Sequence, residues 1–132
     1  MRVLIDTNVL SELEFLKWIR GTEGIERFMS TITLMEFGYH LFKKGKGEGR
    51  LKAFAELYSI LRTPLNEDAA LVAARSAAGR WNFRERARDY AIGATAICLN
   101  AILITKNLKD FDWMPNGKVM DPEKFKDNYS AK

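Results

Sequence analysis

The chain has 132 residues and a mass of 15.1 kDa, which fits one domain and leaves too little sequence for a second independent core. Hydrophobic residues make up 47% and charged residues 29%, so this composition fits neither a disordered chain nor a fibrous repeat. The formal net charge of +4 weakly favours polyanionic partners such as nucleic acids. The single cysteine, Cys98, and the single histidine, His40, exclude an internal disulfide and a Cys/His zinc cage.

The hydropathy pattern predicts no membrane segment. No apolar stretch approaches the roughly 20 residues that span a bilayer. The apolar start of the chain is interrupted by Asp6 and Asn8, which is not typical of a signal peptide. We therefore expect a soluble, cytoplasmic protein.

The first elements are a strand and a helix. Residues 3–5 are apolar and β-branched at two positions, which predicts a buried strand over 1–6 that ends at Asp6. From Ser11 the apolar residues recur at helical spacing, and Gly21 provides a stop.

A second unit begins near residues 28–32. Thr33, followed three residues later by Glu36, predicts a capping box that opens a helix to Lys44. Residues 43–52 alternate lysine, arginine and glycine, which predicts a mobile basic loop between two helices.

The second half of the chain repeats the alternation of helix and strand. Apolar residues at helical spacing predict a helix over 51–61, and a capping asparagine followed by two acids predicts another over 66–80. A helix with a face of small residues is expected over 84–99. Residues 101–104 predict a second buried strand, and residues 117–120 a short final one.

Strands separated by helices predict an α/β fold. We expect one domain over 1–132, with a central parallel sheet of four to five short strands flanked by helices. In such sheets, binding sites lie beyond the carboxyl ends of the strands. The first strand ends at Asp6, and the helix, strand and loop over 84–111 are expected to complete the site there.

Acidic and amide side chains fall at these strand ends and at adjoining helix starts. A buried carboxylate after a strand needs a cation or hydrogen-bond donors, although Asp6 has a second interpretation as a cap of the following turn. Glu36 has the capping-box alternative, and Asp89 has the alternative of a partner for the helix dipole beside two arginines. Asn107 and Asp110 have the spacing of a short helix cap. Together, however, these oxygen donors suit a hard cation such as Mg²⁺ or Mn²⁺.

Four blocks of sequence resemble PIN-domain ribonucleases, especially the VapC-type toxins of prokaryotic toxin–antitoxin pairs. They are the opening block with VLIDTNVL at residues 3–10, STITLMEF at 30–37, DYAIGATA at 89–96 and LITKNLKDF at 103–111. Each block is weakly specific, but all four occur in the order of the family and frame almost the whole chain. The resemblance implies a PIN-like α/β domain.

The resemblance also implies an activity and a set of site residues. The implied function is an endoribonuclease dependent on Mg²⁺ or Mn²⁺, which hydrolyses RNA phosphodiesters with a metal-activated water. The implied metal-binding and catalytic acids are Asp6, Glu36 and Asp89, with a fourth contribution from Asn107, Asp110 or both. The implied supporting residues are Thr7, Asn8, Ser30 and Thr105. Gly93 stands where the family usually has alanine, which is expected to loosen its helix slightly.

Cationic residues flanking the acids are expected to hold RNA, with residues 43–52 as an outer candidate. The nearest in sequence are Arg86, Arg88, Lys106 and Lys109. We further expect a homodimer that binds a cognate antitoxin, because VapC-type relatives pair in this way. The first three predicted helices carry more aromatic residues than so small a domain easily buries, namely Phe15, Trp18, Phe37, Tyr39, Phe42, Phe54 and Tyr58. An apolar groove between these helices would suit an amphipathic antitoxin segment whose tail places an arginine or lysine against the acids.

Several alternatives remain open at this point. The chain is alternatively a stand-alone RNA-processing nuclease, or a non-catalytic PIN-like module that binds RNA or protein.

The residues argue against two other classes of protein. A haloacid-dehalogenase-type phosphatase needs a second aspartate where this chain has Asn8. A receiver domain does not place an acid inside a helix, as is expected here for Asp89.

Overall fold

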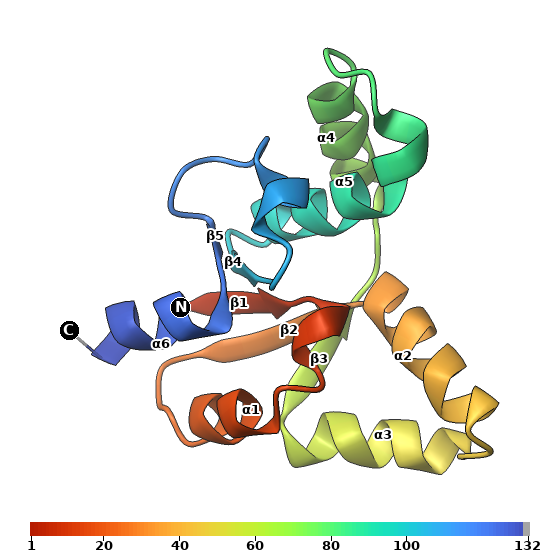
Figure 1. The fold of residues 1–132 in the computed structure, drawn as a ribbon, viewed down its shortest axis with the longest axis vertical. Helices are drawn as coiled ribbons and strands as arrows, with labels where there is room; N and C mark the ends of the chain where they lie inside the picture. Colours follow the sequence, from red (N-terminus) through yellow and green to blue (C-terminus); the bar gives the residue numbers. More distant parts are fainter. Residues whose placement is uncertain (131–132) are drawn as a thin grey trace.

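The central sheet grows outward from the first strand. The computed structural model describes residues 1–130, and its five strands are all parallel, in the order β3-β2-β1-β4-β5 (Figure 1). Because the chain extends the sheet first on one side of β1 and later on the other, β1 and β4 flank the point where the strand order reverses, which is where such sheets bind ligands. The strands are β1 (Arg2–Ile5), β2 (Glu26–Ser30), β3 (Ile60–Thr63), β4 (Ile102–Ile104) and β5 (Val119–Met120).

Helices cover both faces of this sheet (Figure 1). They are α1 (Leu13–Arg20), α2 (Thr31–Lys43), α3 (Glu48–Leu57), α4 (Glu67–Ala77), α5 (Phe83–Cys98) and α6 (Pro122–Ser130), with 3-10 helices η1 (Thr7–Val9) and η2 (Leu108–Phe111). In Figure 1, α1 and α3 lie on one side of the sheet and α4 and α5 on the other. Each helix within residues 1–130 is too short or too polar to traverse a bilayer. The predicted α/β class with a parallel sheet of four to five strands is confirmed, and the sheet has five.

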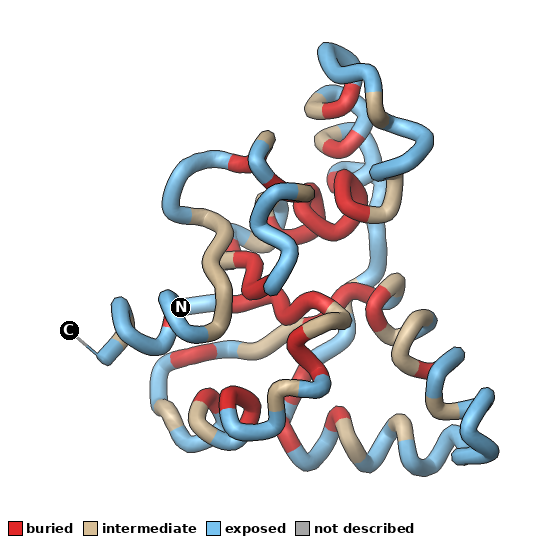
Figure 2. Tube along the Cα trace, viewed as in Figure 1, coloured by how far each residue is buried: buried red, intermediate tan, exposed pale blue. Residues whose placement is uncertain are grey.

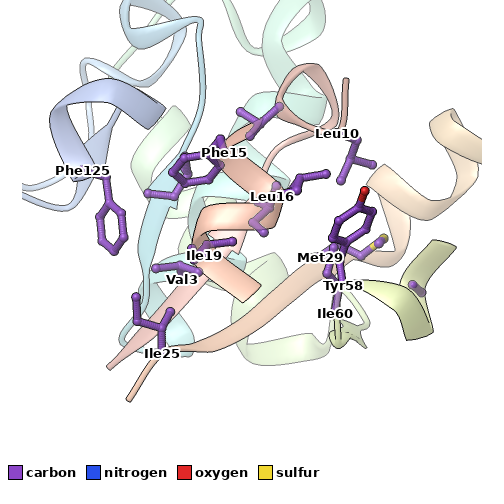
Figure 3. Packing of buried hydrophobic residues seen from close by; sticks show 14 residues of the cluster. Val3, Leu10, Phe15, Leu16, Ile19, Ile25, Met29, Tyr58, Ile60 and Phe125 are labelled. Atoms are coloured by element: carbon purple, nitrogen blue, oxygen red, sulfur yellow. The ribbon is translucent and has the colours of Figure 1, made fainter. Parts of the chain in front are cut away.

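The strand β1 is buried on both faces, as expected for the centre of a parallel sheet. Val3 and Ile5 belong to a cluster with residues of α1, including Leu16 and Ile19 (Figure 3). Leu4 points to the other face and packs in a cluster with Ile92 of α5. Figure 2 shows the consequence, since burial concentrates along β1, α1 and the middle of α5. Packing on both faces therefore holds β1 in place, and with it the carboxyl end of the strand, where Asp6 follows.

The predicted helix over 51–61 is wrong in its second half. The helix α3 ends at Leu57, and the left-handed backbone of Ser59, with φ of 52°, turns the chain into β3. Ile60 is then buried, and β3 pairs with β2. Helical spacing of apolar residues continued past the true helix end, so periodicity alone could not separate the edge strand from the helix.

The predicted loop over 43–52 is also shorter than expected. The helix α2 reaches Lys43, and α3 begins at Glu48, so only the glycine-rich segment between them is a turn. Residues 48–52 form the exposed first turns of α3. Glycine and lysine in this segment favour a loop, but Glu48 in the first turn favours the helix start.

The start of α2 differs from the predicted capping box. Ser30 is the cap, and its Oγ accepts a hydrogen bond from the N–H of Ile32 at 3.0 Å. Thr33 is therefore inside the first turn and is fully buried, while Glu36 lies one turn further along the helix. The reason is that β2 runs directly into α2, which leaves no room for a later start. The capping alternative for Glu36 is thus wrong.

The C-terminal helix α6 was not predicted. Its sequence signal is Asp121 before Pro122, where the Asp121 carboxylate accepts a hydrogen bond from the N–H of Lys124 at 2.7 Å. Phe125 is buried against α1, with ring centroids 6.4 Å from Phe15 and 6.2 Å from Trp18. This helix closes the face of the sheet on which α1 lies.

Candidate functional site

Asp6 occupies the carboxyl end of β1, beside the end of β4. Ile5 pairs with Ile104, and the Asp6 N–H continues the ladder to the Ile104 carbonyl at 2.9 Å. The Asp6 side chain is fully buried, so both carboxylate oxygens need donors. Oδ1 accepts from the N–H of Thr7 at 2.8 Å, and Oδ2 accepts from the Thr105 hydroxyl at 2.8 Å. The turn-capping interpretation of Asp6 is therefore correct, and the same carboxylate also belongs to the cluster described next.

Glu36 reaches the same edge from α2. The Thr7 hydroxyl donates to Glu36 Oε1 at 2.6 Å and lies 3.1 Å from the Thr33 hydroxyl. Because Ser30 caps α2 directly after β2, the first turns of this helix stand beside the end of β1 (Figure 1). Ser30 thus supports the site indirectly, through the helix that carries Glu36.

One guanidinium joins the three predicted acids. Arg88 donates to Asp6 Oδ1, to both oxygens of Glu36 and to Asp89 Oδ1, and each of these four contacts measures 2.8 Å. A further contact, at 3.1 Å, reaches the Thr7 hydroxyl. Arg88 follows a kink in α5, where Arg86 has non-helical backbone angles. Carboxylates from β1, α2 and α5 therefore meet at a single cation.

The pKa shifts reflect this crowding. Burial acts to raise the pKa of Glu36, but hydrogen bonds from Arg88 and Thr7 outweigh it and lower the pKa. Burial, with repulsion from Asp110 and Asp6, raises the pKa of Asp89 despite its bond to Arg88. Burial acts to lower the pKa of Arg88, but its bonds to Glu36 and Asp6 raise it above the ordinary value. The guanidinium therefore stays charged, and the acids compete for it.

Asp110 joins the cluster through a second arginine, whereas Asn107 does not join it. Arg86 Nη1 lies 3.3 Å from an Asp110 oxygen and 3.8 Å from an Asp89 oxygen. Asn107 occupies the cap position of η2 without a side-chain cap bond, and its backbone N–H donates to the Thr105 hydroxyl at 3.1 Å. Of the two candidates for a fourth contribution, Asp110 is therefore the one whose side chain joins the cluster.

Two of the supporting residues brace the loop after β4. The Asn8 amide nitrogen lies 3.4 Å from the Thr105 hydroxyl, and the Asn8 Oδ1 accepts from the N–H of Lys106 at 3.1 Å. Thr105 is fully buried and holds Asp6 as described above. These contacts tie the turn after β1 to the turn after β4.

The four residues predicted to bind RNA fall into two groups. Arg86 and Arg88 are engaged with the acids, and Lys106 forms an ion pair with Glu12 at 2.6 Å. Lys109 is exposed and lines a surface hollow of about 350 Å³ over residues 106–110. Of these four cations, Arg86 and Arg88 contact the site carboxylates, and Lys109 alone has no ion pair within residues 1–130.

The donor set fits a hard divalent cation by its chemistry. Asp6, Glu36 and Asp89 present oxygen atoms to one positive group, which is what Mg²⁺ and Mn²⁺ require of their ligands. Within the described residues, however, no three acidic, histidine or cysteine side chains already have the spacing of a metal site. The carboxylates are turned toward Arg88, which is the cation that they hold in this structure.

Two features of the site region were missed from the sequence. One is the counter-ion role of Arg88, for which the only sequence signal is its position directly before Asp89. The other is Gly93, where a Cβ would lie 2.6 Å from the Trp113 ring and 2.9 Å from the Met114 sulfur. The expected loosening of the helix is therefore the smaller effect, because glycine lets the loop after η2 pack closely onto α5.

Comparisons with known proteins agree with this architecture. The sequence matches the PIN domain family over residues 3–114, whereas no curated protein sequence matches it. Similar solved structures include VapBC-1 from nontypeable Haemophilus influenzae, with TM-score 0.72 and 23% identity over 93% of this chain and 99% of that chain. A toxin–antitoxin complex from Klebsiella pneumoniae has TM-score 0.69 and 24% identity over 91% and 97% of the two chains. PAE2754 from Pyrobaculum aerophilum has TM-score 0.62 and 21% identity over 100% and 91%. From the family match and the shared fold, we conclude that this chain belongs to the PIN domain family.

Proposed function

We propose that this protein is a Mg²⁺- or Mn²⁺-dependent endoribonuclease and the toxin of a toxin–antitoxin pair. The observation that carries the proposal is the meeting of Asp6, Glu36 and Asp89, from three separate elements, where the strand order reverses. Membership of the PIN domain family supports it, as does the similarity in fold to VapBC-1 and to a solved toxin–antitoxin complex. The proposal places the protein in the cytoplasm, where its RNA substrate lies.

The chain's own residues would hold and orient the reacting groups. Asp6, Glu36 and Asp89 are the proposed metal ligands, with Asp110 or Asn107 as the fourth. When bound, a divalent ion supplies Lewis-acid polarisation of the phosphate and a water of lowered pKa. Thr7 and Thr105 keep the Asp6 carboxylate in one orientation, and Thr7 does the same for Glu36. Water attacks the phosphorus, and the bond from phosphorus to the leaving oxygen breaks, so the reaction needs no protein nucleophile.

Arginines beside the acids suit the phosphodiester. A guanidinium matches phosphate oxygens with two parallel hydrogen bonds. Arg86 is half exposed and sits at the rim of the cluster, next to Asp110. We propose that Arg86 contacts the substrate phosphate, with Lys109 nearby on the surface.

An apolar groove between α2 and α3 is the proposed binding site of the antitoxin. Exposed apolar side chains stand on these helices, with Met35 67% and Tyr39 57% exposed. A hollow of about 200 Å³ lies between them, lined by Phe37, Leu41, Arg50, Ala53, Phe54 and Leu57. Such a surface fits an amphipathic segment. We also propose a homodimer, because some exposed aromatic side chains lie outside this groove and are available for a contact between two copies of the chain.

Cleavage of a panel of structured RNAs tests the proposed activity. The wild-type protein should cleave at discrete positions with Mg²⁺ or Mn²⁺, and cleavage should stop with a chelator and with Asp6→Asn. Binding without cleavage at any metal concentration would overturn the nuclease proposal in favour of the non-catalytic module. Cleavage that no small protein from the neighbouring gene inhibits would favour the stand-alone nuclease.

A further inference from the structure

The turn between α4 and α5 exposes a large aromatic side chain that the fold does not use. Trp81 is 90% exposed, more than any other large apolar side chain within residues 1–130. Its neighbour Phe83 is also exposed, at 48%. Figures 1 and 2 show this turn as an exposed projection that points away from the sheet. Two exposed aromatic rings within three residues give this turn an aromatic surface that a partner can contact.

The residues on either side of Trp81 are anchored. The Arg80 guanidinium pairs with Asp112 at 2.9 Å, and the Asn82 Oδ1 accepts a hydrogen bond from the Tyr90 hydroxyl at 2.8 Å. Tyr90 is itself buried between α4 and α5, together with Ala73 and Ala77. The turn is thus held from both sides while the Trp81 ring faces solvent. Because the turn is already held in place, binding a ligand to this ring costs little conformational entropy.

The charge around this ring is positive. Residues 75–86 contain Glu85 as their only acid and four exposed arginines, Arg75, Arg80, Arg84 and Arg86. Arg80 pairs with Asp112 and Arg86 with Asp110, whereas Arg75 and Arg84 form no ion pair within residues 1–130. A hollow of about 340 Å³ adjoins the turn and is lined by Arg80, Phe83 and alanines of α4. Exposed aromatics among cations are the surface that proteins use to bind single-stranded nucleic acids.

We propose that this basic aromatic turn, defined as Arg80, Trp81, Phe83 and Arg84, binds a single-stranded segment of the RNA substrate. One base stacks on Trp81 while the arginines contact the adjacent phosphates. Duplex bases are already stacked on one another and are not open to the indole, so the turn selects unpaired RNA. The inference rests on the proposed ribonuclease function and adds how the substrate is held.

The geometry connects this turn to the acids. Phe83 and Asp89 are six positions apart in α5, which corresponds to about 9 Å along a helix axis, a length that a few nucleotides cover. Arg86 lies between them and already pairs with Asp89 and Asp110. A strand stacked on Trp81 can therefore continue along the arginines of α5 to the carboxylates.

Binding measured without cleavage tests the inference. We would measure the fluorescence anisotropy of a labelled unpaired RNA dodecamer and of a labelled RNA duplex, with a chelator present. Trp81→Ala should weaken binding of the unpaired RNA by about 5- to 150-fold, the equivalent of about 1–3 kcal/mol per stacked base, and leave duplex binding unchanged. Trp81→Phe should retain most of the affinity. Leu13→Ala, at an exposed apolar residue on α1, is the control and should change neither.

Three results would overturn the inference. They are equal binding by wild type and Trp81→Ala, an equal loss on both RNAs, and a loss accompanied by dissociation of a dimer in sedimentation equilibrium. The last would mean that Trp81 meets a second copy of the chain. Because binding is measured with a chelator present and without cleavage, a failed nuclease proposal remains distinguishable from a failed binding turn.

Discussion

Replacing Arg88 with methionine removes the one cation that three carboxylates share. Methionine keeps much of the aliphatic length but leaves the fully buried Asp6 without its counter-ion. Asp89, with 9% of its side chain exposed, keeps only the 3.8 Å contact with Arg86. Removing one partner of a buried ion pair costs about 3–5 kcal/mol. Arg88 and Glu36 are each about one-third exposed, with side-chain exposures of 34% and 30%, so solvent compensates in part. We expect Arg88→Met to lower the metal-free stability by about 2–4 kcal/mol.

Thermal denaturation in the presence and absence of a chelator measures this effect. For a domain of this size, each kcal/mol shifts the Tm by about 3 °C, so the metal-free variant should melt about 6–12 °C below wild type. Mn²⁺ should then stabilise the variant more than wild type, because the carboxylates have lost the cation they hold. An ion at about 100 times its Kd contributes about 2.7 kcal/mol, enough to restore most of the loss.

Arg86→Met is the matched control. Its guanidinium is 46% exposed and its two carboxylate contacts are longer, at 3.3 and 3.8 Å, so the expected loss is below about 1 kcal/mol. If Arg88→Met is no less stable than Arg86→Met, or if Mn²⁺ stabilises both variants equally, Arg88 does not balance the acids and the reasoning fails.

Three further predictions concern the support of the site. Gly93→Ala should destabilise the fold by about 1–2 kcal/mol in urea unfolding, because overpacking against Trp113 exceeds the gain in helix propensity; an equal loss in a Trp113→Leu background would contradict this. Ser30→Ala should cost about 1 kcal/mol through the lost cap of α2, whereas Ser30→Gly should cost less. The pKa of Glu36 is lowered on folding, so its contribution to stability is present above its unfolded pKa and is lost as the pH falls through the folded value. Glu36→Gln should therefore show a smaller drop in the urea midpoint between about pH 5.5 and about pH 3.5 than wild type, and an equal drop would refute the assignment.

The local pattern of the sequence was sufficient for most elements of the sheet. Apolar runs of three or four residues ending at Asp6 and Thr105 predicted β1 and β4, because a strand buried on both faces must be continuously apolar. Asn66 before two acids predicted the start of α4, since a cap acts on its own first turn. The strand β3 was missed because its start depends on the turn at Ser59 and on pairing with β2. Neither feature can be recognised from the spacing of apolar residues along this segment.

The candidate site was also predictable from the sequence only in part. Because parallel strands end at one edge, sequence order alone predicted that Asp6, Glu36 and Asp89 would gather there. Which cation they would meet depended on tertiary structure, because Arg88 reaches the other two acids only through the kink in α5 and the packing of α5 against the sheet. Residue type and spacing therefore determined the carboxylates and their edge, while the three-dimensional packing of β1, α2 and α5 decided that one arginine of the chain itself contacts all three.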